Sequence, residues 1–190
     1  MAKYKITSFH IVIFFLLAVL VFEATSFYRG ISYIVNKYKW QDTFAKLNSS
    51  YFKTSMEYGS LEPSLEKHMV FETLTKNLNV KKLCQNSVKD RCWAKKSFYI
   101  NGSTAYSYDP YPGFILDNGV SVSGIHDTTA TCDSQRICNI ISIDINGLER
   151  PNKFGADQFR IYYFKDKVVP YYHGDDNLVG TTVKHYLNFK

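Results

Sequence analysis

Residues 9–58 read FHIVIFFLLAVLVFEATSFYRGISYIVNKYKWQDTFAKLNSSYFKTSMEY, and this stretch decides the fold. Its first part, Ile11 to Phe22, is an unbroken apolar run. Its second part, Ile31 to Met56, is more polar, and its apolar residues recur at helical steps on one stripe. We therefore predict a single long helix, about 75 Å in length at 1.5 Å per residue, which a domain of this size cannot cover. The stripe, with Trp40 filling a gap, consists of Ile31, Ile34, Tyr38, Phe44, Leu47 and Tyr51.

Charged residues flanking the apolar run predict its orientation in a membrane. Lys3 and Lys5 precede the run, and the first acidic residue is Glu23. This asymmetry predicts a single-pass membrane protein whose amino end stays in the cytoplasm while the rest of the chain is exported. The uninterrupted run is shorter than the ~20 residues that span a bilayer, although Phe9 and Phe27 extend it.

The same segment has a second interpretation as a secretory signal peptide. Ala24-Thr25-Ser26 has the small residues of a cleavage site. Cleavage after Ser26 would release a secreted, disulfide-containing binding domain. The helical stripe continues directly past this site, which favours the membrane anchor.

Length and composition allow one domain with an extension. The chain has 190 residues, of which 45% are hydrophobic, a content that argues against wholesale disorder. We expect a membrane segment over residues 1–26, an amphipathic helix over 27–59 and a globular head over 60–190. Gly59 is a typical residue after a helix, and Pro63 suits the first turn of a second helix, whose inward face would carry Leu65, Met69, Leu74 and Leu78.

Short β-like runs separated by turn residues follow from Ser97 onward. Phe114 to Leu116 and Val120 to Val122 flank Asp117-Asn118-Gly119, a strong hairpin signal. Ser97 to Ile100, Ile140 to Ile145, Phe159 to Phe164 and Val168-Val169 are the other expected strands. Such a series predicts an antiparallel sheet with one face on the helical stripe, and therefore an α+β fold.

The four cysteines form two close pairs along the chain, Cys84 with Cys92 and Cys132 with Cys138. Neither pair has the C-x-x-C spacing of a zinc or thiol redox site. In an exported chain they predict disulfides. Four cysteines permit three pairings, and nearness along the chain favours the local ones.

Basic residues cluster between Lys76 and Lys96, where seven of them accompany only Asp90. Such a cluster can contact anionic lipid or nucleic acid electrostatically. No nucleic-acid-binding motif accompanies it, so we expect a solvated face and no nucleic-acid partner. The seven are Lys76, Lys81, Lys82, Lys89, Arg91, Lys95 and Lys96.

A polar loop offers candidate calcium ligands at Asp144, Asn146, Asn152 and Asp157. Calcium takes six to eight oxygen ligands, so backbone carbonyls and water would have to complete the shell. The spacing is not that of an EF-hand. The favoured interpretation is a loop whose Asp and Asn side chains bond neighbouring backbone amides, without a cofactor.

The sequence contains no pattern typical of an enzyme. His126-Asp127 and His173-Gly174-Asp175-Asp176 are the only histidines next to acidic residues, and neither has a nucleophile elbow or metal-ligand spacing. We therefore expect no catalytic residues and no small-molecule substrate.

The stretch from Ile143 to Phe159, IDINGLERPNKFGADQF, resembles the carboxy-terminal segment of bacterial type IV pilin-like and type II secretion pseudopilin-like proteins. The segment from Cys84 to Trp93, the Phe114 to Gly119 hairpin and the helix around Tyr38 are similar to that family too. The resemblance implies a helix that lies first in the inner membrane and then in the core of a filament, carrying a small head.

By the same resemblance, the chain would be a non-catalytic, minor or accessory subunit of a type IV pilus or a type II secretion system. Its partners would be other pilin-like subunits or the secretion machinery. The stripe would pack partly on its own sheet and partly on these partners, through Ile31, Ile34, Tyr38, Phe44 and Leu47. The leader departs from the family pattern, because Ser8 stands where a glycine precedes the first mature residue and Ile13 stands at the position of the family's glutamate. A membrane-anchored, unprocessed pilin-like protein would tolerate this departure.

Overall fold

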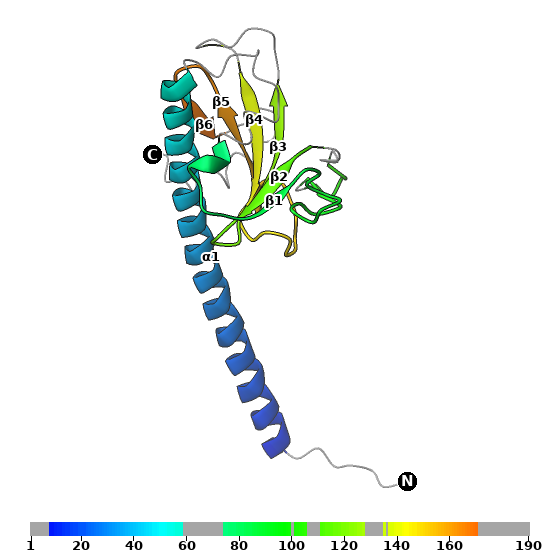
Figure 1. The fold of residues 1–190 in the computed structure, drawn as a ribbon. Coiled ribbons are helices and arrows are strands. Elements are labelled where there is room, and N and C mark those ends of the chain that lie inside the picture. Colours follow the sequence, from blue (N-terminus) through cyan, green and yellow to red (C-terminus); the bar gives the residue numbers. More distant parts are fainter. Residues whose placement is uncertain are drawn as a thin grey trace. The chain divides into compact units, whose positions relative to one another are not determined.

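The computed structural model describes residues 8–58, 74–99, 101–105, 111–127, 135 and 137–170. One helix precedes a sheet whose six strands are neighbours in chain order, each antiparallel to the next (Figure 1). The predicted α+β fold is therefore confirmed. The elements are α1 (Ser8–Tyr58), β1 (Val80–Cys84), β2 (Gly113–Leu116), β3 (Ser121–Asp127), β4 (Asn139–Asp144), β5 (Gln158–Tyr163) and β6 (Val168–Pro170).

The predicted hairpin over residues 114–122 is confirmed as β2 and β3. Phe114 pairs with Val122, and the backbone N–H of Leu116 donates to the carbonyl of Val120 at 2.9 Å. Gly119 closes the turn with a φ of 83°, a conformation that glycine adopts at no steric cost. The strands expected over 140–145, 159–164 and 168–169 correspond to β4, β5 and β6.

The first strand differs from the expectation. Residues 97–100 were predicted to form a strand, but Phe98 makes only isolated bridges, one of them with Lys153. The sheet begins instead at β1, whose three central residues are exposed. β1 is an edge strand, where lysines discourage pairing with another chain, so it lacks the apolar alternation of a half-buried strand.

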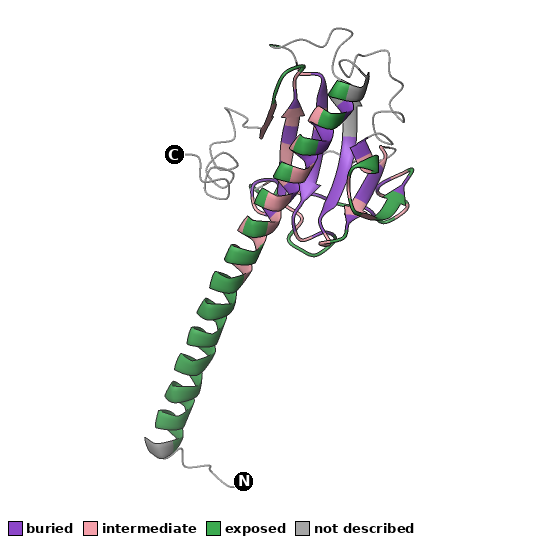
Figure 2. Cartoon of the chain, turned by 60° about the vertical axis from the view of Figure 1, so that its left-hand side comes forward, coloured by how far each residue is buried: buried purple, intermediate pink, exposed green. Residues whose placement is uncertain are grey.

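The second half of α1 packs on the sheet and forms the core of the head. The Trp40 ring lies 4.9 Å from that of Phe159, and the Tyr51 ring lies 4.5 Å from that of Tyr163. Figure 2 shows buried residues on the sheet and on one side of this part of the helix. The buried core comprises Trp40, Leu47, Tyr51, Leu74, Phe114, Leu116, Val120, Val122, Ile141, Ile143, Ile145, Phe159, Ile161 and Tyr163.

The chain divides into two compact units, Met1–Lys37 and Tyr38–Lys190, and the division falls within α1. Residues from Tyr38 onward belong with the sheet because Trp40, Leu47 and Tyr51 are buried in its core. Of the expected second helix, residues 59–73 lie outside the described residues, and Leu74 is buried in the core.

Candidate interaction surfaces

The first half of α1 presents large apolar side chains to its surroundings. The side chains of Phe14 and Phe22 are 77% and 68% exposed. Helix α1 contains a segment with a mean hydropathy of 2.3, and α1 is the one described helix that is long and apolar enough to span a membrane. By length and composition this segment is consistent with a membrane span, and a signal sequence near the amino terminus would have the same properties.

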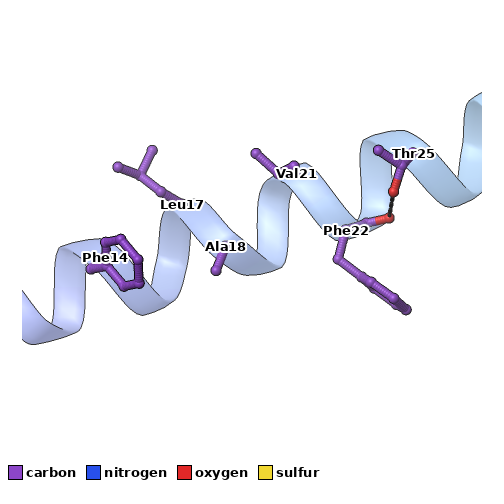
Figure 3. Close-up of a pocket in the computed structure, with 6 residues that line it drawn as sticks. All are labelled: Phe14, Leu17, Ala18, Val21, Phe22 and Thr25. Atoms are coloured by element: carbon purple, nitrogen blue, oxygen red, sulfur yellow. Dashed lines mark hydrogen bonds between the residues drawn. The ribbon is translucent and has the colours of Figure 1, made fainter.

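Of the six residues of this segment that Figure 3 draws, Thr25 alone has a polar side chain. Its hydroxyl donates to the carbonyl oxygen of Phe22 at 2.8 Å. Because that bond is made within the helix, the hydroxyl needs no water, and the surface is compatible with hydrocarbon. The residues drawn are Phe14, Leu17, Ala18, Val21, Phe22 and Thr25.

Exposed apolar residues continue beyond the apolar run on one face of α1. Phe27, Ile31, Ile34 and Tyr38 follow one another at helical steps of four, three and four residues, and are 72%, 45%, 66% and 69% exposed. We call these four residues the outer face. Tyr28 and Val35, which are 74% and 45% exposed, extend the apolar surface beside this face.

Within the head, the same spacing continues through Gln41, Ala45 and Ser49, which are exposed but not large and apolar. The opposite face of the helix is buried against the sheet. The buried residues of α1 are Trp40, Thr43, Leu47, Ser50, Tyr51 and Thr54. Beyond Tyr38, therefore, the helix packs on its own sheet with one face and presents a polar face outward.

The structure divides the predicted interaction stripe into two groups. Ile31, Ile34 and Tyr38 are exposed and available to a partner, whereas Leu47 is fully buried and Phe44 packs against the core. A partner cannot contact Leu47 without unfolding the head.

The four candidate calcium ligands lie in one hydrogen-bonded network after β4. The carboxylate of Asp157 accepts backbone N–H bonds from Asn152 at 2.7 Å and Lys153 at 2.6 Å. The carboxylate of Asp144 accepts from the backbone N–H of Asn146 at 3.3 Å and from the side chain of Gln158 at 2.8 Å. These bonds fix the path of the loop, as the favoured interpretation expected.

Burial perturbs both carboxylates. It raises the pKa of Asp144 to about 8, with the negative charge of Asp157 as the next cause. Burial also raises the pKa of Asp157, against the opposing effect of its backbone donors. N–H groups face the Asp157 oxygens, and the described residues contain no group of three or more His, Cys, Asp or Glu side chains that could hold a metal. The favoured loop without a cofactor and the alternative calcium site both stay predictions.

Cys84 and Cys92 are joined in a disulfide, which confirms the first predicted pair. The bridge closes a tight loop in which the backbone N–H groups of Cys92 and Trp93 both donate to the carbonyl of Ser87. Cys138 is also disulfide-bonded. Cys132 lies outside the described residues, so that pairing stays a prediction.

The two histidine–acid neighbours do not form a described site. His126 and Asp127 end strand β3, opposite Ile140 and Asn139. The second pair, in residues 173–176, lies outside the described residues. The absence of catalysis stays a prediction.

No protein-family model, no curated protein and no solved structure matches this chain. The structure itself has a long, apolar amino-terminal helix followed by a small antiparallel sheet, which is the layout that the pilin-like resemblance implied. This layout supports the coarser part of the resemblance, and membership of the family is taken up as a proposal below.

Proposed function

We propose that this chain is a non-catalytic, pilin-like subunit, a minor or accessory component of a type IV pilus or a type II secretion system. Its first segment anchors it in the bacterial inner membrane, and its head lies in the periplasm or on a filament. The observation that carries the proposal is the outer face of α1, which exposes Phe27, Ile31, Ile34 and Tyr38.

The outer face has the spacing with which one helix packs on another. Side chains at steps of three and four form the ridges that fit between the ridges of a neighbouring helix. Phe27 also extends the membrane-spanning run, but Ile31, Ile34 and Tyr38 lie beyond it. An apolar surface that is exposed to water marks a protein contact, because that exposure is unfavourable. The preferred partner is therefore the corresponding helix of another pilin-like subunit.

The proposal does not require a processed leader. Ser8 and Ile13 stand where the family has glycine and glutamate, so an uncleaved anchor that joins an assembly by lateral helix contacts suits this sequence. The surface contact depends on residues beyond the apolar run, and both a processed and an unprocessed chain would keep it.

Two substitutions on α1 distinguish a specific contact at the outer face from a requirement for a folded head alone. Ile34→Asp puts a charge on the exposed outer face, and Ala45→Asp makes the same change at an exposed position past it. Both variants should keep the unfolding free energy of the head within about 0.5 kcal/mol, because both sites are exposed. Of the two variants, only Ile34→Asp should lose co-purification with pilin-like subunits from membranes of the native host.

Equal co-purification of both variants with such subunits would overturn the proposal. The mature amino terminus supplies an independent check. A protein that begins at Phe27 and is recovered from the soluble fraction would favour a secreted binding domain, released after Ser26, over a membrane-anchored subunit.

A further inference from the structure

Among the described residues, the lining of a groove in the head includes six basic side chains and no acidic one. The groove has a volume of about 1010 Å³ and lies between the loop that follows β1 and the loop that joins β4 to β5. The first loop supplies four of the basic residues and the second supplies two. The six are Lys89, Arg91, Lys95, Lys96, Arg150 and Lys153.

Backbone hydrogen bonds hold the two loops together. The N–H of Phe98 donates to the carbonyl of Asn152 at 3.0 Å, and the N–H of Phe154 donates to the carbonyl of Phe98 at 2.9 Å. The Cys84–Cys92 disulfide constrains the first loop. The carboxylate of Asp157 holds the second loop by accepting from the N–H groups of residues 152 and 153. The groove is therefore built before any ligand arrives, which lowers the entropic cost of binding.

None of the six basic side chains takes part in an ion pair between described residues, although Asp90 and Glu149 lie in the same two loops. The ion pairs that Lys46 of α1 forms lie outside the groove. Five of the six basic residues are exposed, and Lys153 is half-buried. Such a cluster attracts an anionic ligand and steers its approach.

The apolar residues of the groove narrow the class of anion. Leu148 is 44% exposed and Pro151 is exposed, so aliphatic surface lies among the cations. The aromatic rings are less accessible, since Trp93 is 2% exposed and Phe98 is half-buried. Single-stranded nucleic acid binds by stacking its bases on open aromatic rings, and the groove lacks such rings.

We propose that this groove binds an acidic peptide segment of a partner protein, in which aspartate or glutamate residues are interspersed with aliphatic ones. The carboxylates contact the lysines and arginines, and the aliphatic side chains lie on Leu148 and Pro151. This site is separate from the outer face of α1. The groove brings the basic cluster near Cys92 together with Arg150 and Lys153, which lie some sixty positions further along the chain.

The test measures peptide binding by fluorescence anisotropy with the full chain in neutral detergent micelles. The probe is a labelled peptide in which glutamate alternates with leucine. Matched peptides replace every leucine with serine or every glutamate with glutamine, and labelled oligothymidine serves as the nucleic acid. The glutamate–leucine peptide should bind most tightly, and its affinity should fall as salt is added.

Two double variants with the same change in net charge locate the site. Lys95→Glu with Arg150→Glu reverses two charges in the groove, whereas Lys76→Glu with Lys81→Glu reverses two exposed charges outside it. The first should weaken binding about tenfold, because two attractive contacts become repulsive, and the second less than about twofold. Leu148→Ser should weaken binding of the leucine-containing peptide and leave the serine-containing one unchanged.

Equal weakening by both double variants would show a response to net charge alone and would overturn the site. Tighter binding of oligothymidine would assign the groove to nucleic acid instead, and undiminished binding of the glutamine–leucine peptide would remove the acidic requirement. If the double variant in the groove fails to fold, Lys95→Gln alone makes the same distinction with a smaller loss. Ile34→Asp should leave peptide binding unchanged, so failure here and failure of the subunit proposal are distinguishable.

Discussion

Replacing Asp144 with asparagine should remove most of the pH dependence of the stability of the head. Asp144 is fully buried, and burial together with the charge of Asp157 raises its pKa to about 8 from the 3.8 of an unperturbed aspartate. Between those values the folded chain binds a proton that the unfolded chain releases. Stability is therefore highest in acid and falls as the pH rises towards the folded pKa.

The magnitude follows from proton linkage. One proton held only by the folded state changes the unfolding free energy by about 1.4 kcal/mol for each pH unit. Between about pH 5 and pH 7, Asp144 should therefore lower stability by up to about 3 kcal/mol. Asp157 acts in the same direction, since burial raises its pKa too, so the variant should keep a weaker dependence.

Urea unfolding of the full chain in neutral micelles, monitored through tryptophan fluorescence with a chelator present, measures this difference. Glu149→Gln, which changes an exposed carboxylate in the same loop, is the matched control and should preserve the wild-type slope. An Asp144→Asn variant with the full wild-type slope would refute the reasoning. The reasoning would also be refuted if the wild-type chain became more stable than the variant as the pH rises. That result would mean that Asp144 is ionised in the folded chain and that its charge is stabilised there.

Three further changes test the packing and the loops. Trp40→Ala should lower the unfolding free energy of the head by about 3–5 kcal/mol because it removes the contact with Phe159. Gln41→Ala, at an exposed position, should change that free energy by less than about 0.5 kcal/mol. Equal effects of the two variants in urea unfolding would contradict the assigned faces of the helix. Replacing both Cys84 and Cys92 with serine should lower the unfolding free energy of the head by about 2–3 kcal/mol, as the chain-entropy model gives for a short loop. An unchanged midpoint of urea unfolding would contradict this contribution of the disulfide. Millimolar calcium should leave the midpoint at neutral pH unchanged, and a rise would establish binding at the loop after β4.

The long helix and most of the sheet could be predicted because local patterns encode them. The apolar run and helical spacing define α1, and the Asp117-Asn118-Gly119 turn sets the register of β2 and β3. Strand β1 could not be found this way, because an edge strand rich in lysine has no apolar alternation. Its identity depends on pairing with β2, which is distant in sequence.

The buried face of α1 was only partly predictable from apolar spacing. Thr43, Ser50 and Thr54 are buried there beside Trp40. The hydroxyl of Ser50 donates to the carbonyl of Leu74 at 2.7 Å. A count of apolar positions omits such residues. The predicted stripe combined exposed and buried positions because the step of six residues from Tyr38 to Phe44 passes from the exposed face of the helix to the buried one.

The functional surfaces also needed contacts between distant residues. The sequence identified Asp144 and Asp157 in the loop after β4, but it gave no sign that Gln158 would donate to Asp144. It identified the basic cluster that ends at Lys96 as well. Only the bridge between Phe98 and Lys153 brings that cluster beside the basic residues of the second loop.

Site-specific photocrosslinking tests the central proposal, that the outer face of α1 contacts another pilin-like subunit. A photoreactive residue replaces Ile34 on the outer face in one strain of the native host and Ser49, exposed past that face, in another. Mass spectrometry then identifies the crosslinked protein and residue. We predict a crosslink from position 34 to the amino-terminal helix of a pilin-like protein and none from position 49. A membrane-inserted, folded chain that forms no such crosslink from position 34 would contradict the account.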